Sequence, residues 1–172
     1  MPAIESKLAP VIEETITVGL GDIFATDNPS ISLACFGLGS CIGLCAYDPV
    51  VRVAGMAHIV LPASIHKGQE TSTKFADVAV PALVKEMRKL GALKSRLVVK
   101  LVGGAQMILS ADFDSSFEMG LRNLKMTQKA LASEGIRTAA SDTGGNQGRT
   151  VWLYADSGRV MVRTAGQPAQ EL

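Results

Sequence analysis

The chain has 172 residues, and its 17 lysines and arginines nearly balance its 16 aspartates and glutamates, for a formal net charge of +1. This length is enough for one domain with its own core, and an apolar content of 47% excludes wholesale disorder. The near-zero charge and the 5% aromatic content give no basis for nucleic-acid binding. The sequence contains no apolar run long enough for a membrane span, so we expect no membrane insertion.

The cysteines, at positions 35, 41 and 45, are few and odd in number. This usage is typical of a reducing compartment, so we expect a cytoplasmic protein. Their spacing matches no zinc motif, and the sequence contains no glycine pattern typical of phosphate or dinucleotide binding. We therefore expect neither a metal nor another cofactor.

The first half of the chain is dominated by apolar segments of strand length. After a flexible arm over 1–12, β-branched or alternating residues predict strands over 14–20, 31–40, 41–48 and 51–62. Turn residues separate these strands at 27–30 and 48–50. The 3.6-residue apolar repeat of 73–91 predicts a helix, in which Pro81 marks a kink or a late start.

The second half alternates strands and helices before it ends in a hairpin. Its pattern predicts a strand over 96–104, a helix over 121–135, a short strand over 136–142, a hairpin over 150–164 and a flexible tail over 166–172. This order is not a regular alternation of strand and helix. We therefore predict one α+β domain over 1–172, with mixed or antiparallel sheets packed as a sandwich and two long helices outside.

The segment GLGSC at 37–41 is the first candidate for chemistry. Its glycines let a substrate carbonyl approach the backbone, and the amide of Cys41 is suited to donate to an oxyanion. A cysteine nucleophile also needs a base, because a free thiol is mostly protonated at pH 7. An antiparallel pairing around Asp48 would bring His58, a costly residue in an apolar strand, close to Cys41. Alternatively, both residues simply pack in the core, as Cys45 is expected to do.

Six short motifs follow one another over about residues 15–166: GLGSC at 37–41, GMAH at 55–58, KFAD at 74–77, GGAQM at 103–107, GLRN at 120–123 and DTGGNQGR at 142–149. In these motifs the sequence resembles the CheD family of chemoreceptor glutamine deamidases. The resemblance implies an enzyme of bacterial or archaeal chemotaxis that hydrolyses selected glutamine side chains of methyl-accepting receptors to glutamate. It also implies a sandwich-like fold shared with toxin deamidases of the cytotoxic-necrotizing-factor type.

The resemblance also implies roles for individual residues. Cys41 corresponds to the nucleophile and His58 to the base of a reaction that passes through a thioester, which water then hydrolyses. We expect the oxyanion to be held by the Cys41 amide and by Ser40, beside Gly39. The implied partners are the cytoplasmic part of methyl-accepting receptors and a CheC-type phosphatase.

Two departures from the family pattern concern the third catalytic position and a docking loop. The family carries a threonine six residues before the cysteine, where this chain has Cys35. A thiol is a poor hydrogen-bond acceptor, so we expect the Cys35 main-chain carbonyl, or less effectively its sulfur, to orient His58. The loop expected to dock the receptor or the phosphatase contains Gly104, Met107 and Ile108, the last of which replaces a frequent aromatic residue.

Other functions stay open. Capture of the same thioester by an amine would give transglutamination, and methyl-ester hydrolysis at the receptor is a possible side activity. A non-catalytic adaptor that binds the phosphatase or a receptor is the alternative from another class, favoured by the departure at Cys35. Faster alkylation of Cys41 than of Cys35 or Cys45, with a pH midpoint below about 8.5, would identify an enzyme.

Overall fold

A computed structural model describes residues 11–65, 68, 71–107 and 118–172. The elements of these residues are, in chain order, β1 (Glu14–Thr17), β2 (Ile23–Thr26), β3 (Ile31–Leu38), β4 (Ile42–Asp48), β5 (Val53–Ile59), α1 (Ala76–Lys89), the 3-10 helix η1 (Lys94–Arg96), β6 (Val98–Gly103), α2 (Met119–Ser133), β7 (Thr138–Thr143), β8 (Arg149–Tyr154), β9 (Val160–Thr164) and β10 (Gln170–Glu171). Both predicted helices are present, and α1 continues through Pro81 rather than starting there.

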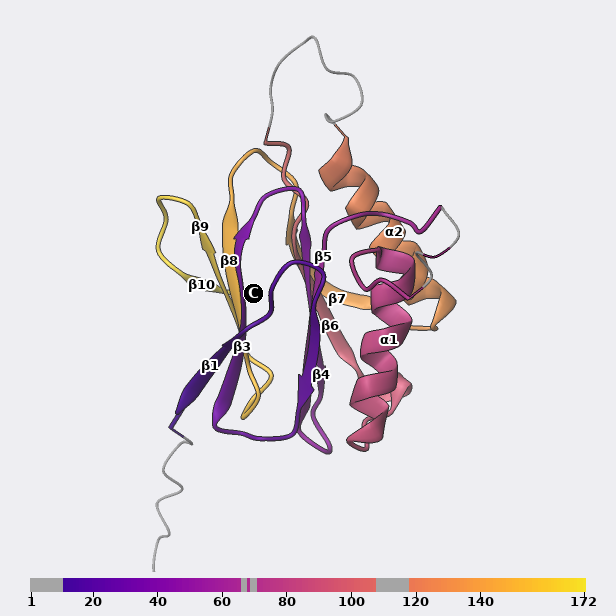
Figure 1. The fold of residues 1–172 in the computed structure, drawn as a ribbon. Coiled ribbons are helices and arrows are strands. Elements are labelled where there is room, and N and C mark those ends of the chain that lie inside the picture. Colours follow the sequence, from indigo (N-terminus) through magenta and orange to yellow (C-terminus); the bar gives the residue numbers. More distant parts are fainter. Residues whose placement is uncertain (1–10, 66–67, 69–70, 108–117) are drawn as a thin grey trace, which may run out of the picture.

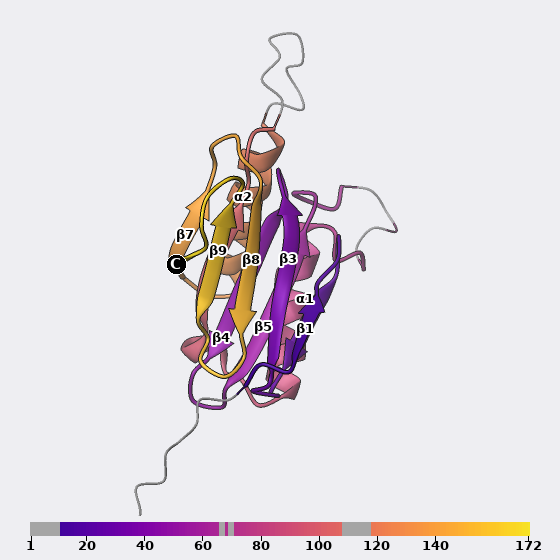
Figure 2. The ribbon, with the colours of Figure 1, turned by 90° about the vertical axis from the view of Figure 1, so that its left-hand side faces the viewer.

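The strands form two five-stranded sheets that lie face to face (Figure 1). The first sheet has the order β1-β3-β8-β9-β10 and the second has the order β2-β5-β4-β6-β7. The pairs β1–β3 and β6–β7 are parallel, and the other pairs are antiparallel. Both α1 and α2 lie on the outer side of the second sheet, whereas the first sheet faces the viewer uncovered in Figure 2. The predicted α+β sandwich with outer helices is confirmed.

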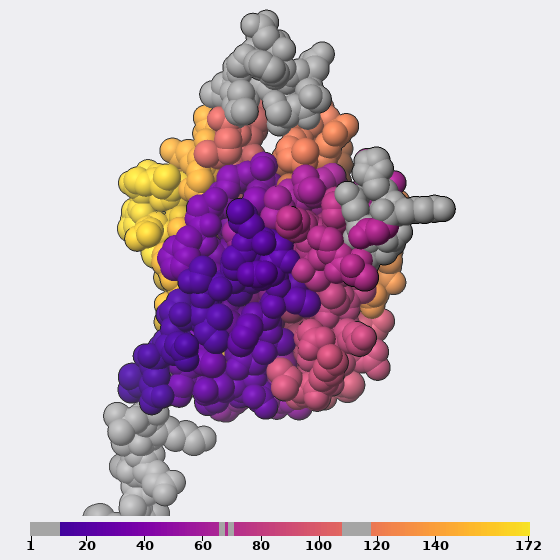
Figure 3. Space-filling model, in the orientation of Figure 1, coloured from indigo at the N-terminus to yellow at the C-terminus, as the bar shows by residue number. Residues whose placement is uncertain are grey.

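The three layers explain why the strands differ in sequence pattern. The second sheet is the middle layer, so β4 and β5 are buried along their whole length and read as continuous apolar runs. One core, which includes Leu44 and Leu83, fills the space between this sheet and the helices. Another, which includes Met56 and Val151, fills the space between the two sheets. Buried and partly exposed residues alternate along β8, because the first sheet is covered on one face. In the space-filling view, the first half of the chain, coloured from indigo to magenta, makes up most of the face that is seen (Figure 3).

Two short edge strands were not predicted from the sequence. β2 pairs with β5 at one edge of the second sheet, and β10 pairs with β9 at one edge of the first. The segment 166–172, expected to be a flexible tail, thus includes β10. The Leu172 amide donates to the Val160 carbonyl at 3.0 Å, and Lys100 Nζ donates to the Leu172 main-chain oxygen at 2.5 Å. Leu172 also packs against the inter-sheet core, so burial and hydrogen bonds together hold this segment.

Candidate active site

The β4–β5 hairpin puts Cys41 and His58 on the same face of the second sheet. Its strands are antiparallel, with Gly43 opposite His58 and Ile42 opposite Ile59. Successive strand residues point to alternate faces, so Cys41, two positions before Gly43, faces the same way as His58. That face is turned toward the first sheet, because Cys41 packs against the inter-sheet core. The two residues are thus diagonal neighbours at the open end of the hairpin, a separation that side chains can span.

The imidazole of His58 is buried and only half satisfied. Its side chain is 3% exposed, and Nδ1 lies 3.0 Å from the Val18 carbonyl oxygen. A carbonyl oxygen only accepts, so Nδ1 carries the hydrogen and Nε2 of the neutral ring keeps its lone pair. Among the described residues no group hydrogen-bonds to Nε2. An unpartnered buried acceptor costs about 1–3 kcal/mol, and here it is the nitrogen that a general base would use.

The backbone of His58 is fixed by the segment that follows β1. The Gly21 amide donates to the His58 carbonyl at 2.9 Å, and the His58 amide donates to the Asp22 carbonyl at 3.0 Å. Together with the Val18 contact, the segment 18–22 makes three hydrogen bonds that hold both the main chain and the ring of His58. These hydrogen bonds fix the direction in which Nε2 points in this structure.

The turn over 39–41 has all of its carbonyl groups bonded to the body of the protein. The Ala105 amide donates to the first carbonyl at 2.8 Å, Asn123 Nδ2 to the second at 2.9 Å, and the Gly104 amide to the third at 2.8 Å. Gly103, at φ 110°, is required here, because a Cβ at this position would overlap the Cys41 carbonyl. Within the described residues, the Ser40 amide has no acceptor, and the Cys41 amide is bonded only to its own thiol. These amides are donors available to an oxyanion.

The three thiols lie in different environments. Cys35 and Cys45 are buried, whereas Cys41 is only partly so. Burial raises the pKa of the Cys45 thiol to about 12, although Lys100 acts in the opposite direction. Burial, helped by the other two thiols, raises the pKa of Cys35 well above its ordinary value. Burial also raises the pKa of the Cys41 thiol, against a lowering by its own backbone N–H. Cys41 is thus the accessible thiol, and it needs a base to ionise near neutral pH.

The resting geometry is not that of a formed ion pair. Within the described residues, no hydrogen bond joins the Cys41 sulfur to His58 Nε2. Contacts between a nucleophile and its base are often long without substrate and shorten when substrate binds. No group of three or more His, Cys, Asp or Glu side chains in the described segments is arranged to hold a metal ion. None of the described helices has the length and apolar character that a membrane crossing requires.

Comparison with known proteins establishes the family. The family model described as "CheD chemotactic sensory transduction" matches residues 60–164. A protein of Symbiobacterium thermophilum named "Probable chemoreceptor glutamine deamidase CheD" is 45% identical over 157 residues, which is 90% of this chain and 95% of the relative. The chain belongs to the CheD family.

A second relative also supports membership of this family, and solved structures were compared as well. A relative with the same printed name in Caldanaerobacter subterraneus subsp. tengcongensis is 44% identical over 88% of this chain and 93% of its own length. Among solved structures, a Bacillus licheniformis hypothetical protein, YfiH, aligns with a TM-score of 0.43 and 15% identity, over 82% of this chain and 61% of its own. The matched stretch of the CheD family model starts after Cys41 and His58, so the positions of these residues rest on the hairpin register.

In this CheD chain the structure shows a different hydrogen-bond partner for the His58 ring than Cys35, which was expected to orient it. The ring hydrogen bond of His58 goes to the Val18 carbonyl, and the Cys35 thiol donates instead to Met56 Sδ at 3.4 Å. Met56 precedes His58 by two positions on the same face of β5, so Cys35 lies one pleat deeper in the inter-sheet core. Val18 reaches His58 because its amide bonds to the Ala34 carbonyl beside Cys35. A main-chain carbonyl thus contacts the ring, but it belongs to Val18 and not to Cys35.

The described part of the expected docking loop borders the Cys41 turn. Met107 is 54% exposed, and a Cβ on Gly39 would lie 2.9 Å from its Cγ, so the two residues are in contact. Gly104 bonds to the Cys41 carbonyl and also lines a hollow of about 270 Å³ with Gly144 and other residues. Ile108, the third residue expected in this loop, lies outside the described residues.

Sequence reasoning missed two residues that hold the site together. Val18 contributes only a main-chain oxygen, which leaves no mark in the side-chain pattern. Asn123 was noted as part of a family motif but was given no role. Its full burial on an amphipathic helix is the signal that could have singled it out, because a buried amide must be hydrogen-bonded.

Proposed function

We propose that this chain hydrolyses glutamine side chains of methyl-accepting chemotaxis receptors to glutamate, with Cys41 as nucleophile and His58 as general base. The observation that supports this most directly is the buried Nε2 of His58, which has no partner among the described residues and lies on the face that also carries Cys41. The printed names of the relatives describe the same reaction class. We place the reaction in the cytoplasm, where a reduced thiol persists.

In the first half of the reaction, His58 Nε2 takes the proton of the Cys41 thiol. The thiolate attacks the carboxamide carbon of glutamine, and the amides of Ser40 and Cys41 donate hydrogen bonds to the negative charge that develops on oxygen. The protonated Nε2 then gives its proton to the amide nitrogen. Ammonia leaves, and the side chain remains bound to Cys41 as a thioester.

In the second half, the same nitrogen of His58 removes a proton from water. The resulting hydroxide attacks the thioester carbon, the same amides hold the oxyanion, and the C–S bond breaks. Cys41 leaves as a thiolate and takes back the proton held by His58. The net reaction converts glutamine and water to the carboxylic acid and ammonia, which become glutamate and ammonium once the acid gives up its proton. Throughout, the Val18 carbonyl keeps Nδ1 as the donor and stabilises the imidazolium.

The binding partner of this site is proposed to be the cytoplasmic part of a receptor or, in competition, a CheC-type phosphatase. Gly104 and Met107 support this location, because one bonds to the Cys41 turn and the other lies exposed against Gly39. A partner seated there would cover the access to Cys41. Binding of the phosphatase would then inhibit deamidation by occlusion.

The test is ammonia release from a purified receptor cytoplasmic fragment, with mass spectrometry to locate each new glutamate. Release by the wild-type chain, lost in Cys41→Ala, is the expected result. Modification of no glutamine by the wild-type chain would contradict the proposal. In that case a non-catalytic adaptor is favoured, which agrees with the missing Cys41–His58 hydrogen bond and the raised pKa of the Cys41 thiol.

A further inference from the structure

Asn123 is a fully buried amide on α2 that joins the two chain segments carrying the candidate catalytic residues. Its side chain is 0% exposed. Nδ2 donates to the Ser40 carbonyl and to the Val60 carbonyl, each at 2.9 Å. Ser40 directly precedes Cys41, and Val60 follows His58 by two positions. Both hydrogens of the amide are therefore used to tie the turn of the nucleophile to the strand of the base.

The contact with Ser40 fixes the direction of the Cys41 amide. The Ser40 carbonyl and the Cys41 N–H belong to the same peptide unit, and none of the described peptide bonds is cis. In a trans peptide the C=O and N–H groups point in opposite directions. Because Asn123 holds the carbonyl toward α2, the N–H of Cys41 points away from α2. A hydrogen bond to the carbonyl also polarises the peptide and strengthens its N–H as a donor.

The rest of the Asn123 environment shows a cost that packing alone does not explain. Its Oδ1 is buried and, among the described residues, has no hydrogen-bond partner. Leaving a buried carbonyl oxygen unpartnered is unfavourable, and an apolar side chain would avoid it. The helix is held close by Gly120, where an added Cβ would lie 2.5 Å from the Gly104 carbonyl oxygen. The close contact between α2 and the residue that follows β6 thus places Asn123 next to the turn over 39–41.

We infer that Asn123 is a positioning residue, which orients the Cys41 amide as an oxyanion donor and is not itself in contact with substrate. The inference rests on the proposed deamidase function. It gives the GLRN motif a role in stabilising the transition state through the Cys41 amide. It also explains why a side-chain amide with two hydrogens is present at a fully buried position of α2. The other two carbonyls of the turn are held by main-chain amides, so Asn123 is the side chain that completes the set.

The test compares Asn123→Asp and Asn123→Leu with a control, Thr127→Val. The aspartate keeps the shape of the side chain and loses both donors, and the leucine fills a similar volume. Thr127 is equally buried one turn further along α2, and its hydroxyl bonds to the Asn123 main-chain carbonyl without reaching the turn. Each variant is assayed for kcat and KM in ammonia release from the receptor fragment, and for the rate of Cys41 alkylation by iodoacetamide. Alkylation needs the thiolate but forms no oxyanion, so it separates the two roles.

We expect kcat of both Asn123 variants to fall about 100-fold, per alkylatable Cys41, as for loss of one oxyanion donor. KM and the alkylation rate should stay within about threefold of wild type, the signature of an interaction made only in the transition state. The Thr127→Val variant should lose stability and keep its kcat. If one Asn123 variant does not fold, the other decides.

A kcat within about threefold of wild type in a folded Asn123 variant would overturn the inference while leaving the proposed function intact. A parallel loss of alkylation and kcat would also overturn it, because Asn123 would then act on the Cys41–His58 pair or on the fold. If the wild-type chain itself releases no ammonia, the proposed function fails, and the inference fails with it.

Discussion

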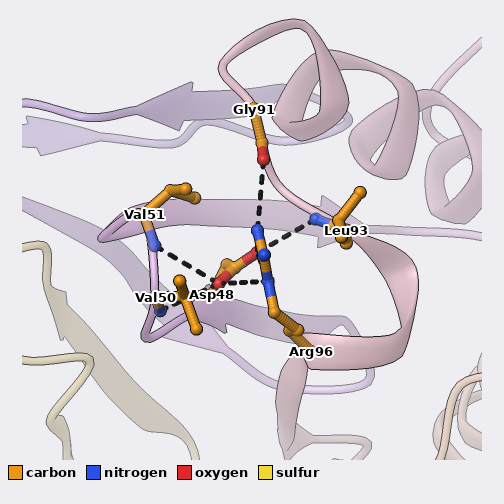
Figure 4. A network of polar contacts seen from close by, with 6 residues as sticks. All are labelled: Asp48, Val50, Val51, Gly91, Leu93 and Arg96. Carbon is orange, nitrogen blue, oxygen red and sulfur yellow. Dashed lines mark hydrogen bonds and ion pairs between the residues drawn. The ribbon is translucent and has the colours of Figure 1, made fainter.

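The two ends of the β4–β5 hairpin each bury a polar side chain, and they treat it in opposite ways. At the closed end, Asp48 is 0% exposed and its carboxylate is fully bonded (Figure 4). It accepts from the amides of Val50, Val51 and Leu93, and it forms an ion pair with Arg96 at 2.8 Å. At the open end, one nitrogen of the buried His58 ring has no partner in the described part of the chain. Full hydrogen bonding fits a structural role for Asp48, and the unpartnered ring nitrogen fits the role of general base that we propose for His58.

The difference is also electrostatic. Burial on its own would raise the pKa of the Asp48 carboxyl, but the hydrogen bonds from Arg96 and from the three main-chain amides outweigh it and lower the pKa. The charge is therefore stable where it lies, and it locks η1 to the hairpin turn. At the other end, burial raises the pKa of the Cys41 thiol. One end of the hairpin thus carries a permanent charge, whereas in the proposed mechanism the other end carries a charge only during the reaction.

The strongest test of this comparison removes the two groups at the open end. Cys41→Ala and His58→Ala should each lower ammonia release by about 10³-fold or more, because nucleophile and base act together. The melting temperature should change little in Cys41→Ala, since the side chain is only partly buried. Cys45→Ala is the matched control on the same strand, and it should lower stability with full activity per folded molecule. Substantial activity in Cys41→Ala would end the assignment.

The complementary substitution acts at the closed end. Asp48→Asn should lower the free energy of unfolding by about 2–3 kcal/mol, because it leaves Arg96 without its counter-charge and weakens three amide contacts. Chemical denaturation measures this, and kcat per folded molecule should be unchanged. Equal loss of activity and stability would mean that the two ends are coupled and that the contrast is too simple.

Acid should destabilise the protein through the same carboxylate. A carboxyl whose folded pKa lies below its unfolded value contributes stability above the unfolded value, near pH 4, and loses it as pH falls toward the folded pKa. The unfolding free energy of the wild-type chain should therefore drop below about pH 4. In Asp48→Asn this part of the pH dependence should be reduced. Identical acid profiles of the two proteins would contradict a lowered pKa at Asp48.

The pH dependence of Cys41 alkylation sharpens the other side of the comparison. Burial raises the pKa of this thiol, so a midpoint below about 8.5 in the wild-type chain requires help from His58. His58→Ala should move the midpoint above that value, because burial then outweighs the lowering by the Cys41 backbone N–H. Cys45, with a pKa of about 12, should stay unreactive in the folded protein and serves as the internal reference. A midpoint unaffected by His58→Ala would separate the two residues functionally.

The smallest effect is expected at Cys35. Its sulfur bonds to Met56 and not to His58, so Cys35→Ala should change kcat by less than about threefold while it leaves a small cavity. Cys35→Thr tests whether a hydroxyl one pleat deeper than the ring influences it, and little change in kcat is expected. A large gain or loss of kcat without a change in stability would assign Cys35 to the site after all.

The sequence was informative where side-chain pattern carries the structure. Continuous apolar runs predicted β4 and β5, the turn at Asp48 predicted their antiparallel pairing, and the pairing brought His58 to the face of Cys41. It was uninformative where short edge strands or main-chain atoms do the work. β2 and β10 are too short for a period to show, and Val18 acts through its carbonyl.

All three carbonyls of the turn over 39–41 accept hydrogen bonds from the body of the protein. This arrangement affects how fast the amide hydrogens of the turn exchange with solvent. In the described structure the Ser40 amide has no acceptor and the Cys41 amide bonds only to its own thiol, although both residues directly precede a strand whose residues are all buried. These two amides should exchange hydrogen for deuterium faster than the amides of the neighbouring residues. A bound anion that mimics the tetrahedral intermediate should slow those two positions selectively, which makes them a reporter of site occupancy that needs no turnover.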